Sequence, residues 1–239
     1  MSPAPSPAFV AGAPGYVGQA VVRRLRALGA EVHAHVRPDS PRLADWRVRF
    51  TALGAHVDAT PWDEDAMTAT LARVRPAAVF ALLGTTRARG RTAPGDTYES
   101  VDYGLTALLR RAAERAARET GAAPRFVYLS AAGVADDTRN AYLAARARVE
   151  RELRGGTLPW TVARPSFITG PDRAESRPAE RIAAAATDAL LAPVALLGGR
   201  RLADRWRSTT ADELAAALVR LAGDPAEVGQ VLEGDALRG

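Results

Sequence analysis

Two side chains with complementary chemistry lie four residues apart in the segment AYLAARARVE, which spans residues 141–150. Tyr142 carries a phenol that can give or take a proton, and Arg146 carries a permanent positive charge. In a helix, residues at this spacing share one face, with their Cβ atoms about 5–6 Å apart. Because a phenol ordinarily has a pKa of about 10, a fixed cation beside it favours the ionised form. The pair therefore indicates proton-transfer chemistry; the alternative is two ordinary residues of an amphipathic helix.

A second chemical pattern is the glycine-rich stretch GAPGYVG, which places Gly12, Gly15 and Gly18 at three-residue spacing. A short apolar run precedes it, and the helical pattern QAVVRRLRALG follows. Glycines permit a tight turn and let backbone N–H groups approach a diphosphate, which the positive end of the helix dipole also attracts. The stretch predicts a dinucleotide-binding loop, with a purely structural turn as the alternative.

The end of the second expected strand, HVRPDS, indicates which cofactor such a loop would serve. An acidic residue there would bind the adenosine 2′-hydroxyl of NAD, whereas an arginine accommodates the 2′-phosphate of NADP. Arg37 occupies this place, and Ser40 follows three residues later. Since a guanidinium pairs well with phosphate, we expect NADP(H) to be preferred over NAD(H).

These residues need a scaffold in which strands alternate with helices. Apolar runs predict strands at 9–12, 31–37, 54–59, 77–84, 125–130 and 160–165. Amphipathic patterns predict helices at 19–29, 63–74, 101–119, 142–154 and 210–223, the last opened by a capping box from Thr210 to Glu213. The alternation implies an α/β fold: a single Rossmann-type, doubly wound parallel sheet with helices on both faces. We expect a flexible tail at 1–7 and one NAD(P)-binding domain at 8–239, with 170–208 as a small C-terminal substrate cap over the cofactor edge.

Composition argues against several kinds of site. The chain has no cysteine, and its three histidines lie in the first quarter, so we expect no metal site and no Ser–His–Asp triad. All basic side chains behind the net charge of +5 are arginines that alternate with acids, so we expect no nucleic-acid partner. No export signal is evident, and Asp188 and Pro193 interrupt the longest apolar tract, so we expect a cytoplasmic protein without a membrane span. A homodimer is an open alternative to a monomer.

Six short motifs extend over nearly the whole chain: LLGTTR (82–87), VDYGL (101–105), FVYLS (126–130), YLAAR (142–146), the RP of ARPSFITG (163–170) and ESRPAE (175–180). Together they resemble the Tat-interacting-protein oxidoreductase family, an atypical branch of the short-chain dehydrogenases/reductases, with NmrA-like proteins as more distant relatives. ESRPAE is the most distinctive of them. It could place Arg177 near a polar or anionic group, or it could form a structural salt bridge.

The resemblance implies a cofactor site position by position. The glycine loop would hold the diphosphate, Arg37 would meet the 2′-phosphate, and Asp58 would contact adenine unless it is only a turn residue at a strand end. The remaining positions would line the cofactor or flank its nicotinamide. The full set is Gly12, Ala13, Gly15, Tyr16, Val17, Arg37, Asp58, Leu83, Gly84, Thr85, Pro165, Ser166, Phe167 and Ile168.

The resemblance also implies a catalytic set. In that superfamily a tyrosine exchanges the substrate proton, a lysine four residues later binds the nicotinamide ribose, and a serine after the fifth strand orients the substrate carbonyl. Here the roles fall to Tyr142, Arg146 and Ser130, but arginine replaces lysine, and LSAAG has Ala131 at the usual serine position. Asp102 lies where many relatives have an asparagine. We expect hydride transfer between nicotinamide and a small carbonyl or alcohol; a non-catalytic NADP(H)-sensing regulatory or interaction protein is the alternative.

Overall fold

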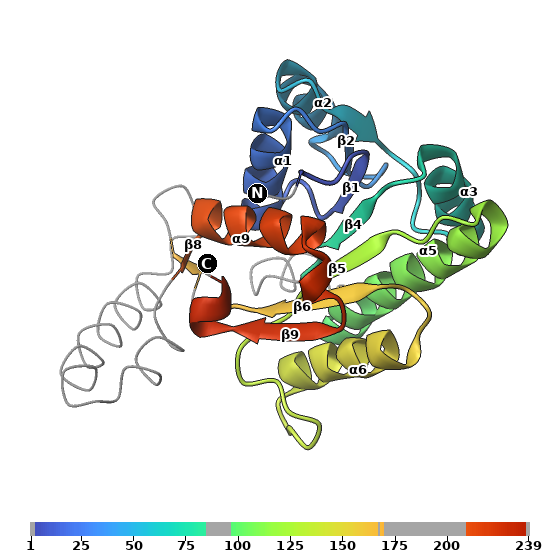
Figure 1. Cartoon of the computed structure of the whole chain (residues 1–239). Coiled ribbons are helices and arrows are strands. Elements are labelled where there is room, and N and C mark those ends of the chain that lie inside the picture. The colour runs from blue at the N-terminus through green and yellow to red at the C-terminus, as the bar shows by residue number, and fades with distance from the viewer. Residues whose placement is uncertain (1–2, 85–96, 167, 170–208, 238–239) are drawn as a thin grey trace.

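The computed structural model describes residues 3–84, 97–166, 168–169 and 209–237, and its centre is a parallel sheet of seven strands (Figure 1). The strand order is β3-β2-β1-β4-β5-β6-β9. The bounds are β1 Ala8–Ala11, β2 Val32–His35, β3 His56–Asp58, β4 Ala78–Ala81, β5 Arg125–Leu129, β6 Trp160–Arg164 and β9 Gln230–Glu233. The predicted α/β fold with a Rossmann-type doubly wound sheet is therefore confirmed.

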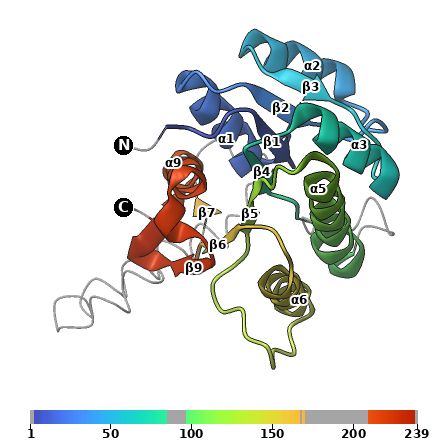
Figure 2. The same cartoon turned by 45° about the vertical axis from the view of Figure 1, so that its right-hand side comes forward.

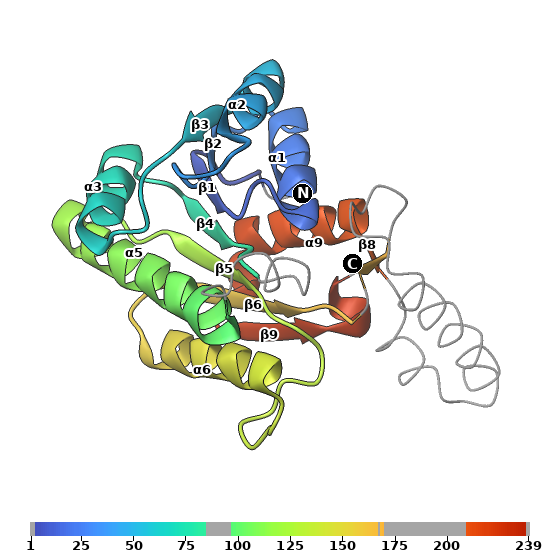
Figure 3. The ribbon, with the colours of Figure 1, turned by 180° about the vertical axis from the view of Figure 1, so that it is seen from behind.

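Helices cover both faces of the sheet, as the turned view shows (Figure 2). One face carries α1 (Tyr16–Ala27), α2 (Leu43–Ala52) and α9 (Ala211–Gly223). The other carries α3 (Glu64–Val74), α5 (Thr106–Thr120) and α6 (Ala141–Gly155), seen from behind in Figure 3. Because successive side chains of a strand point to opposite faces, Val10 packs with the first group and Phe9 with the second.

Short elements complete the described chain. A π-helix, η1 (Tyr98–Leu105), runs directly into α5, and two 3₁₀ turns, η2 (Pro225–Glu227) and η3 (Gly234–Leu237), flank β9. A separate parallel pair, β7 (Ile168–Thr169) and β8 (Thr209–Thr210), lies on either side in sequence of residues 170–208. The substrate cap expected at 170–208, Arg177 included, lies outside the described residues.

Sequence patterns located most elements, and the exceptions have physical reasons. The capping box of α9 is confirmed: Thr210 Oγ accepts from the Glu213 N–H at 3.2 Å, and Glu213 Oε2 accepts from the Thr210 N–H at 2.8 Å. Helix α2 and strand β9 were not predicted. The apolar face of α2 is narrow, formed by the stacked rings of Trp46 and Phe50 at 5.5 Å, and β9 is a short edge strand with only half-buried or exposed residues.

The segment expected to be a flexible tail, residues 1–7, is anchored over its last residues. Pro5 is buried, Ser6 Oγ accepts from the Glu31 N–H at 2.9 Å, and the Pro7 carbonyl accepts from the Ala77 N–H at 2.8 Å. These bonds fix residues 5–7 beside β1. Among the helices that the structure describes, none combines the length and apolar character needed to cross a bilayer.

Candidate functional site

The glycine loop makes close backbone contacts that only glycine permits. Gly12 has φ +82°, and a Cβ there would lie 2.6 Å from the carbonyl oxygen of Leu82 at the end of β4. At Gly18 a Cβ would lie 2.2 Å from the Gly12 carbonyl oxygen, so the first turn of α1 packs directly on the loop. Gly15 is the N-cap of α1, and no side chain of the described residues caps this end. The helix therefore presents backbone N–H groups that suit an anionic ligand.

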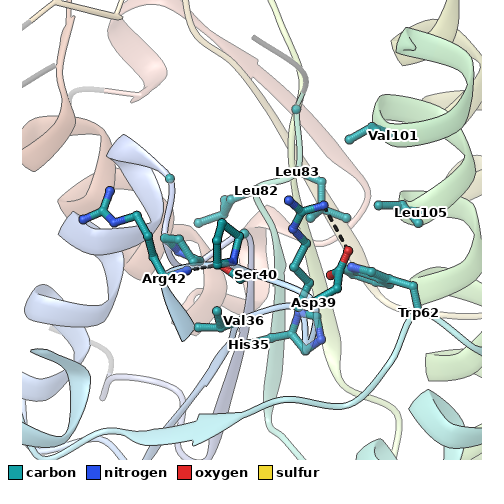
Figure 4. Close-up of a pocket in the computed structure, with 16 residues that line it drawn as sticks. His35, Val36, Asp39, Ser40, Arg42, Trp62, Leu82, Leu83, Val101 and Leu105 are labelled. Carbon is teal, nitrogen blue, oxygen red and sulfur yellow. Dashed lines mark hydrogen bonds and ion pairs between the residues drawn. The ribbon is translucent and has the colours of Figure 1, made fainter. Parts of the chain in front are cut away.

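A cavity of about 960 Å³ opens in front of this loop (Figure 4). It lies beyond the carboxyl ends of β1, β2 and β4, where the strand order reverses and α/β sheets bind their ligands. The cavity walls come from the glycine loop, the loop after β2, one residue after β3, the residues after β4, and η1. The lining residues are Gly12, Pro14, Gly15, His35, Val36, Arg37, Asp39, Ser40, Pro41, Arg42, Trp62, Leu82, Leu83, Gly84, Val101 and Leu105.

Two arginines make the wall after β2 cationic. Arg37 lies 3.5 Å from the carboxylate of Asp39, and its side chain is 36% exposed, so the guanidinium can still meet a ligand. The second is Arg42, whose guanidinium lies over the Trp46 ring at 4.8 Å. The backbone N–H of Arg42 donates to Ser40 Oγ at 3.4 Å. Sequence analysis identified Arg37 and Ser40 but missed Arg42. The signal that could have found Arg42 was a second basic residue within the same loop.

His35 and Trp62 form an aromatic corner that sequence analysis also missed. The two rings meet edge to face with centroids 4.7 Å apart. His35 Nε2 lies 2.8 Å from the Thr60 carbonyl oxygen and must donate to it, because a carbonyl can only accept. Burial lowers the pKa of His35 from its usual 6.5, against the smaller raising effects of this hydrogen bond and of Asp58. The imidazole is therefore neutral at pH 7.

Asp58 ends β3 beside this corner but does not line the cavity. Its Oδ1 accepts from the Thr60 N–H at 3.0 Å, and its Oδ2 lies 3.7 Å from the guanidinium of Arg73. These contacts are those of a turn residue at a strand end, which was the alternative interpretation of this position. The adenine contact of Asp58 stays a prediction.

At the other end of the sheet edge, α6 brings Tyr142 and Arg146 together. The helix begins at Ala141, and the N-cap side chain of Asn140 accepts from the Leu143 N–H at 3.1 Å. The guanidinium of Arg146 lies 4.7 Å from the centroid of the Tyr142 ring, whose edge meets the Tyr98 ring at 5.3 Å. The phenol and the cation thus share one helix face, as their spacing predicts.

Arg146 is buried, and its guanidinium faces protein groups. Nη2 donates to Asp102 Oδ1 at 2.9 Å, and Nη1 donates to the carbonyl of Leu129. Burial lowers the pKa of Arg146, but the opposing effects of Tyr128, Tyr142 and Asp102 are larger and raise it above the usual range, so the side chain stays charged.

Ser130 follows β5 and is also buried. Its Oγ donates to Glu150 Oε1 at 2.7 Å. The same carboxylate accepts from Arg154 at 2.9 Å and, through both oxygens, from Arg164 at 2.9 and 2.6 Å; Arg164 also binds Glu233 at 2.8 Å. The hydrogen bond with Glu150 is the main cause that raises the pKa of Arg164 above its usual range. Sequence analysis did not identify Glu150, which holds the hydroxyl proton of Ser130.

Comparison with known proteins gives the family. Residues 12–195 match the model of a family described as NAD(P)H-binding. The chain belongs to this NAD(P)H-binding family. The match reaches no further than nicotinamide-cofactor binding, so the narrower resemblance to the Tat-interacting-protein oxidoreductases stays a prediction. No curated protein matches the sequence.

Solved structures show that this chain shares its fold with reductases and epimerases. An oxidoreductase of the short-chain dehydrogenase/reductase family from Burkholderia thailandensis is 22% identical, with a TM-score of 0.67 over 98% of this chain and 94% of its own. The NADPH-dependent 3-quinuclidinone reductase from Rhodotorula rubra is 15% identical, with 0.64 over 97% and 90%. A protein described as a putative NAD-dependent epimerase/dehydratase from Bacillus halodurans is 19% identical, with 0.62 over 97% and 96%. At these identities the likeness concerns the fold alone.

The residues of this NAD(P)H-binding chain fit a nicotinamide dinucleotide at the glycine loop, because Gly12 and Gly18 allow the tight turn and the N-terminus of α1, which has no side-chain cap, meets the cavity at Gly15. Of the predicted cofactor residues, the cavity is lined by Gly12, Gly15, Arg37, Leu83 and Gly84. The others described lie elsewhere: Ala13 and Val17 are buried in the core with Tyr16 packed against it, and Ile168 pairs with Thr209. The carbonyl of Pro165 accepts from the Ala132 N–H at 2.9 Å, and Ser166 is half-buried beside it. Thr85 and Phe167 lie outside the described residues.

None of the three predicted catalytic residues lines the cavity, but one lies directly behind it. Gly84 lines the cavity, and a Cβ at Gly84 would lie 3.2 Å from Arg146 Nη2. Arg146 therefore adjoins the cavity at Gly84, and the Tyr142 ring contacts Arg146 at 4.7 Å. Ser130 does not line the cavity, and its hydroxyl donates to Glu150.

Proposed function

We propose that the chain is an NADP(H)-dependent oxidoreductase that transfers hydride between the nicotinamide and a small carbonyl or alcohol. The observation that carries the proposal is the cavity that joins an uncapped helix N-terminus at the glycine loop to the arginines after β2, with the Tyr142–Arg146 pair adjoining its inner end. The substrate is a small molecule, the protein acts in the cytoplasm, and neither nucleic acid nor a membrane is its partner.

The preference for NADP(H) rests on Arg37, Ser40 and Arg42, which line one wall of the cavity. A 2′-phosphate carries charge that guanidinium groups bind through charge-assisted hydrogen bonds. Asp39 is the acid closest to Arg37 in this wall, and it already pairs with that guanidinium. A phosphate can replace Asp39 as the partner of Arg37, whereas the uncharged 2′-hydroxyl of NAD would form a weaker hydrogen bond with this guanidinium.

Tyr142 is the proton donor and acceptor in this proposal. The bound nicotinamide supplies or accepts the hydride. When a carbonyl is reduced, its oxygen takes the proton from Tyr142 Oη, and when an alcohol is oxidised the proton returns there. Arg146 places its guanidinium 4.7 Å from the centroid of the Tyr142 ring and so holds the phenol at this end of the site.

The direct test is NADPH consumption with a panel of small aldehydes and ketones, comparing the wild type with Tyr142→Phe. We expect turnover in the wild type and its loss in the variant, because phenylalanine keeps the ring contacts and removes only the hydroxyl. Tyr98→Phe is the matched control, since its ring contacts Tyr142 at 5.3 Å and the proposal gives its hydroxyl no role. Turnover that survives in Tyr142→Phe would exclude Tyr142 as the proton donor.

A second function, a non-catalytic NADP(H) sensor, is favoured by specific contacts. The Ser130 hydroxyl donates to Glu150, and Arg146 donates to Asp102. Both side chains therefore form hydrogen bonds with protein groups rather than with a substrate. Thermal unfolding with and without NADPH separates the two functions. NADPH at 100 times its Kd should stabilise the fold by about 2.7 kcal/mol in either case. Stabilisation without turnover on any carbonyl would favour the sensor.

A further inference from the structure

A buried ion pair joins η1 to α6 behind the inner end of the cavity. Arg146 Nη2 donates to Asp102 Oδ1 at 2.9 Å, and the two side chains are 6% and 0% exposed. Removing one partner of such a pair leaves the other charge buried without compensation. The position of the guanidinium therefore depends on Asp102.

The same guanidinium ties together the ends of two central strands. Nη1 donates to the carbonyl of Leu129, the last residue of β5, and Nη2 lies 3.5 Å from the carbonyl oxygen of Leu83, two residues after β4. Leu83 and Gly84 line the cavity. Arg146 thus holds one wall of the cavity in place from behind.

The orientation of the guanidinium leaves little for a ligand to bind. Gly84 lies against Nη2, since a Cβ on this glycine would lie 3.2 Å away. Nε is buried and has no hydrogen-bond partner among the described residues. The Arg146 side chain is only 6% exposed, so little of its guanidinium is accessible to a ribose hydroxyl in the cavity.

The contact that Arg146 makes at the reactive end is with Tyr142, through the ring and through a side-chain hydrogen bond that helps to raise the pKa of Arg146. Its guanidinium lies 4.7 Å from the Tyr142 centroid, while the Tyr98 ring meets Tyr142 edge to face from η1, the same element that carries Asp102. Two contacts, one from α6 and one from η1, therefore orient the Tyr142 ring. The ion pair between Asp102 and Arg146 keeps these two elements together.

We infer that Asp102 is a positioning residue of the proposed oxidoreductase. Asp102 neutralises and orients Arg146, and Arg146 in turn holds the Tyr142 ring and the Leu83–Gly84 wall rather than binding the cofactor ribose. The inference rests on the proposed function, because the position of Tyr142 matters for turnover only if Tyr142 exchanges a proton. The aspartate and the arginine thus act as one unit, because each side chain keeps its buried position only while it is paired with the other.

The test compares Asp102→Asn with Glu99→Gln. Glu99 lies on η1 and pairs with Arg148 on α6 at 2.7 Å, so it joins the same two elements, but its side chain is 66% exposed. We expect Asp102→Asn to lower kcat by about 10²-fold, the scale of a small displacement of a reacting group, and to weaken NADPH binding by a smaller factor through the Leu83–Gly84 wall. Glu99→Gln should change none of these quantities.

A paired replacement guards against a variant that fails to fold. Asp102→Val combined with Arg146→Met removes both charges at similar total volume, an exchange that often preserves stability in buried ion pairs. This double variant should keep the thermal midpoint and should lose turnover. A double variant with wild-type kcat, or an Asp102→Asn variant that behaves like Glu99→Gln, would overturn the inference.

The outcomes separate the inference from the proposed function. If the wild type binds NADPH but reduces no carbonyl, the oxidoreductase proposal fails. Amide hydrogen exchange then tests whether Asp102 still positions Arg146. Asp102→Asn should speed amide exchange at Gly84 and in the first turn of α6, with no such change in Glu99→Gln. Equal exchange in the two variants would show that Asp102 positions nothing.

Discussion

The two ends of the candidate site are built in opposite ways. At the nucleotide end, glycine backbone and partly exposed arginines surround an open cavity; at the catalytic end, charged side chains are buried and paired with one another. Arg37 has a side chain 36% exposed, whereas that of Glu150 is 0% exposed. The first end is arranged to receive charge from a ligand, and the second already has its charges satisfied by protein. Substitutions at the first end should therefore change cofactor binding, and substitutions at the second should change stability.

The largest effect is expected at Glu150, the centre of the buried network. Replacing Glu150 with Gln leaves Arg164 and Arg154 without their shared carboxylate, and breaking a buried pair costs about 3–5 kcal/mol of unfolding free energy. Chemical denaturation measures this loss. Asp136→Asn is the matched control, because Asp136 pairs with Arg151 of the same helix with side chains 70% and 51% exposed and should cost at most about 1 kcal/mol. Equal losses in the two variants would remove the distinction between buried and open ends.

Gly12→Ala should give the next largest effect and connects stability with binding. Its positive φ costs about 1–2 kcal/mol for a residue with a Cβ, and the Cβ would also lie 2.6 Å from the Leu82 carbonyl oxygen. Gly29→Ala separates the two causes, since Gly29 has φ +78° with nothing within 4 Å. Both variants should lose stability, but only Gly12→Ala should also lose the thermal shift produced by NADPH. A normal shift in Gly12→Ala would argue against the glycine loop as the diphosphate site.

Arg37→Glu should act on binding with little effect on stability. Losing a charge-assisted hydrogen bond to the 2′-phosphate costs about 1.5–3 kcal/mol, which corresponds to a fall of about 10- to 150-fold in the ratio of NADPH to NADH affinity. Isothermal titration with both dinucleotides measures the ratio. Arg47→Glu makes the same charge change at an exposed residue of α2 outside the cavity wall and should leave the ratio unchanged. An unaltered ratio in Arg37→Glu would contradict the proposed preference for NADP(H).

The smallest effect concerns pH and His35. Because burial lowers the pKa of His35 below its usual 6.5, the unfolded chain binds more protons than the folded one between these two values. Stability should therefore fall as the pH drops below 6.5, by at most about 1.4 kcal/mol per pH unit for this one group. His35→Gln should remove this part of the slope, while His56→Gln, at an exposed position, should keep it. An identical slope in His35→Gln would show that other groups govern acid stability.

The two ends also differ in how far the sequence revealed them. Gly12, Gly15 and Arg37 could be located because their roles depend on backbone freedom and on neighbours in the chain, and all three line the cavity. Tyr142 and Arg146 could be paired because a helix repeats every 3.6 residues. The partners of Arg146 and Ser130 could not be found this way, since Asp102 lies 44 residues and Glu150 20 residues away in the chain.

The sequence by itself determined the alternation of strands and helices, the glycine turn between β1 and α1, and the phenol–cation spacing on α6, all of which depend on local periodicity and backbone sterics. Only the tertiary structure decided that Arg146 pairs with Asp102, that Ser130 donates to Glu150, and that Asp58 lies outside the cavity wall. These outcomes depend on which strand ends lie side by side in the sheet and on which charges must be paired once they are buried. Those constraints join residues distant in the chain, so no single segment records them.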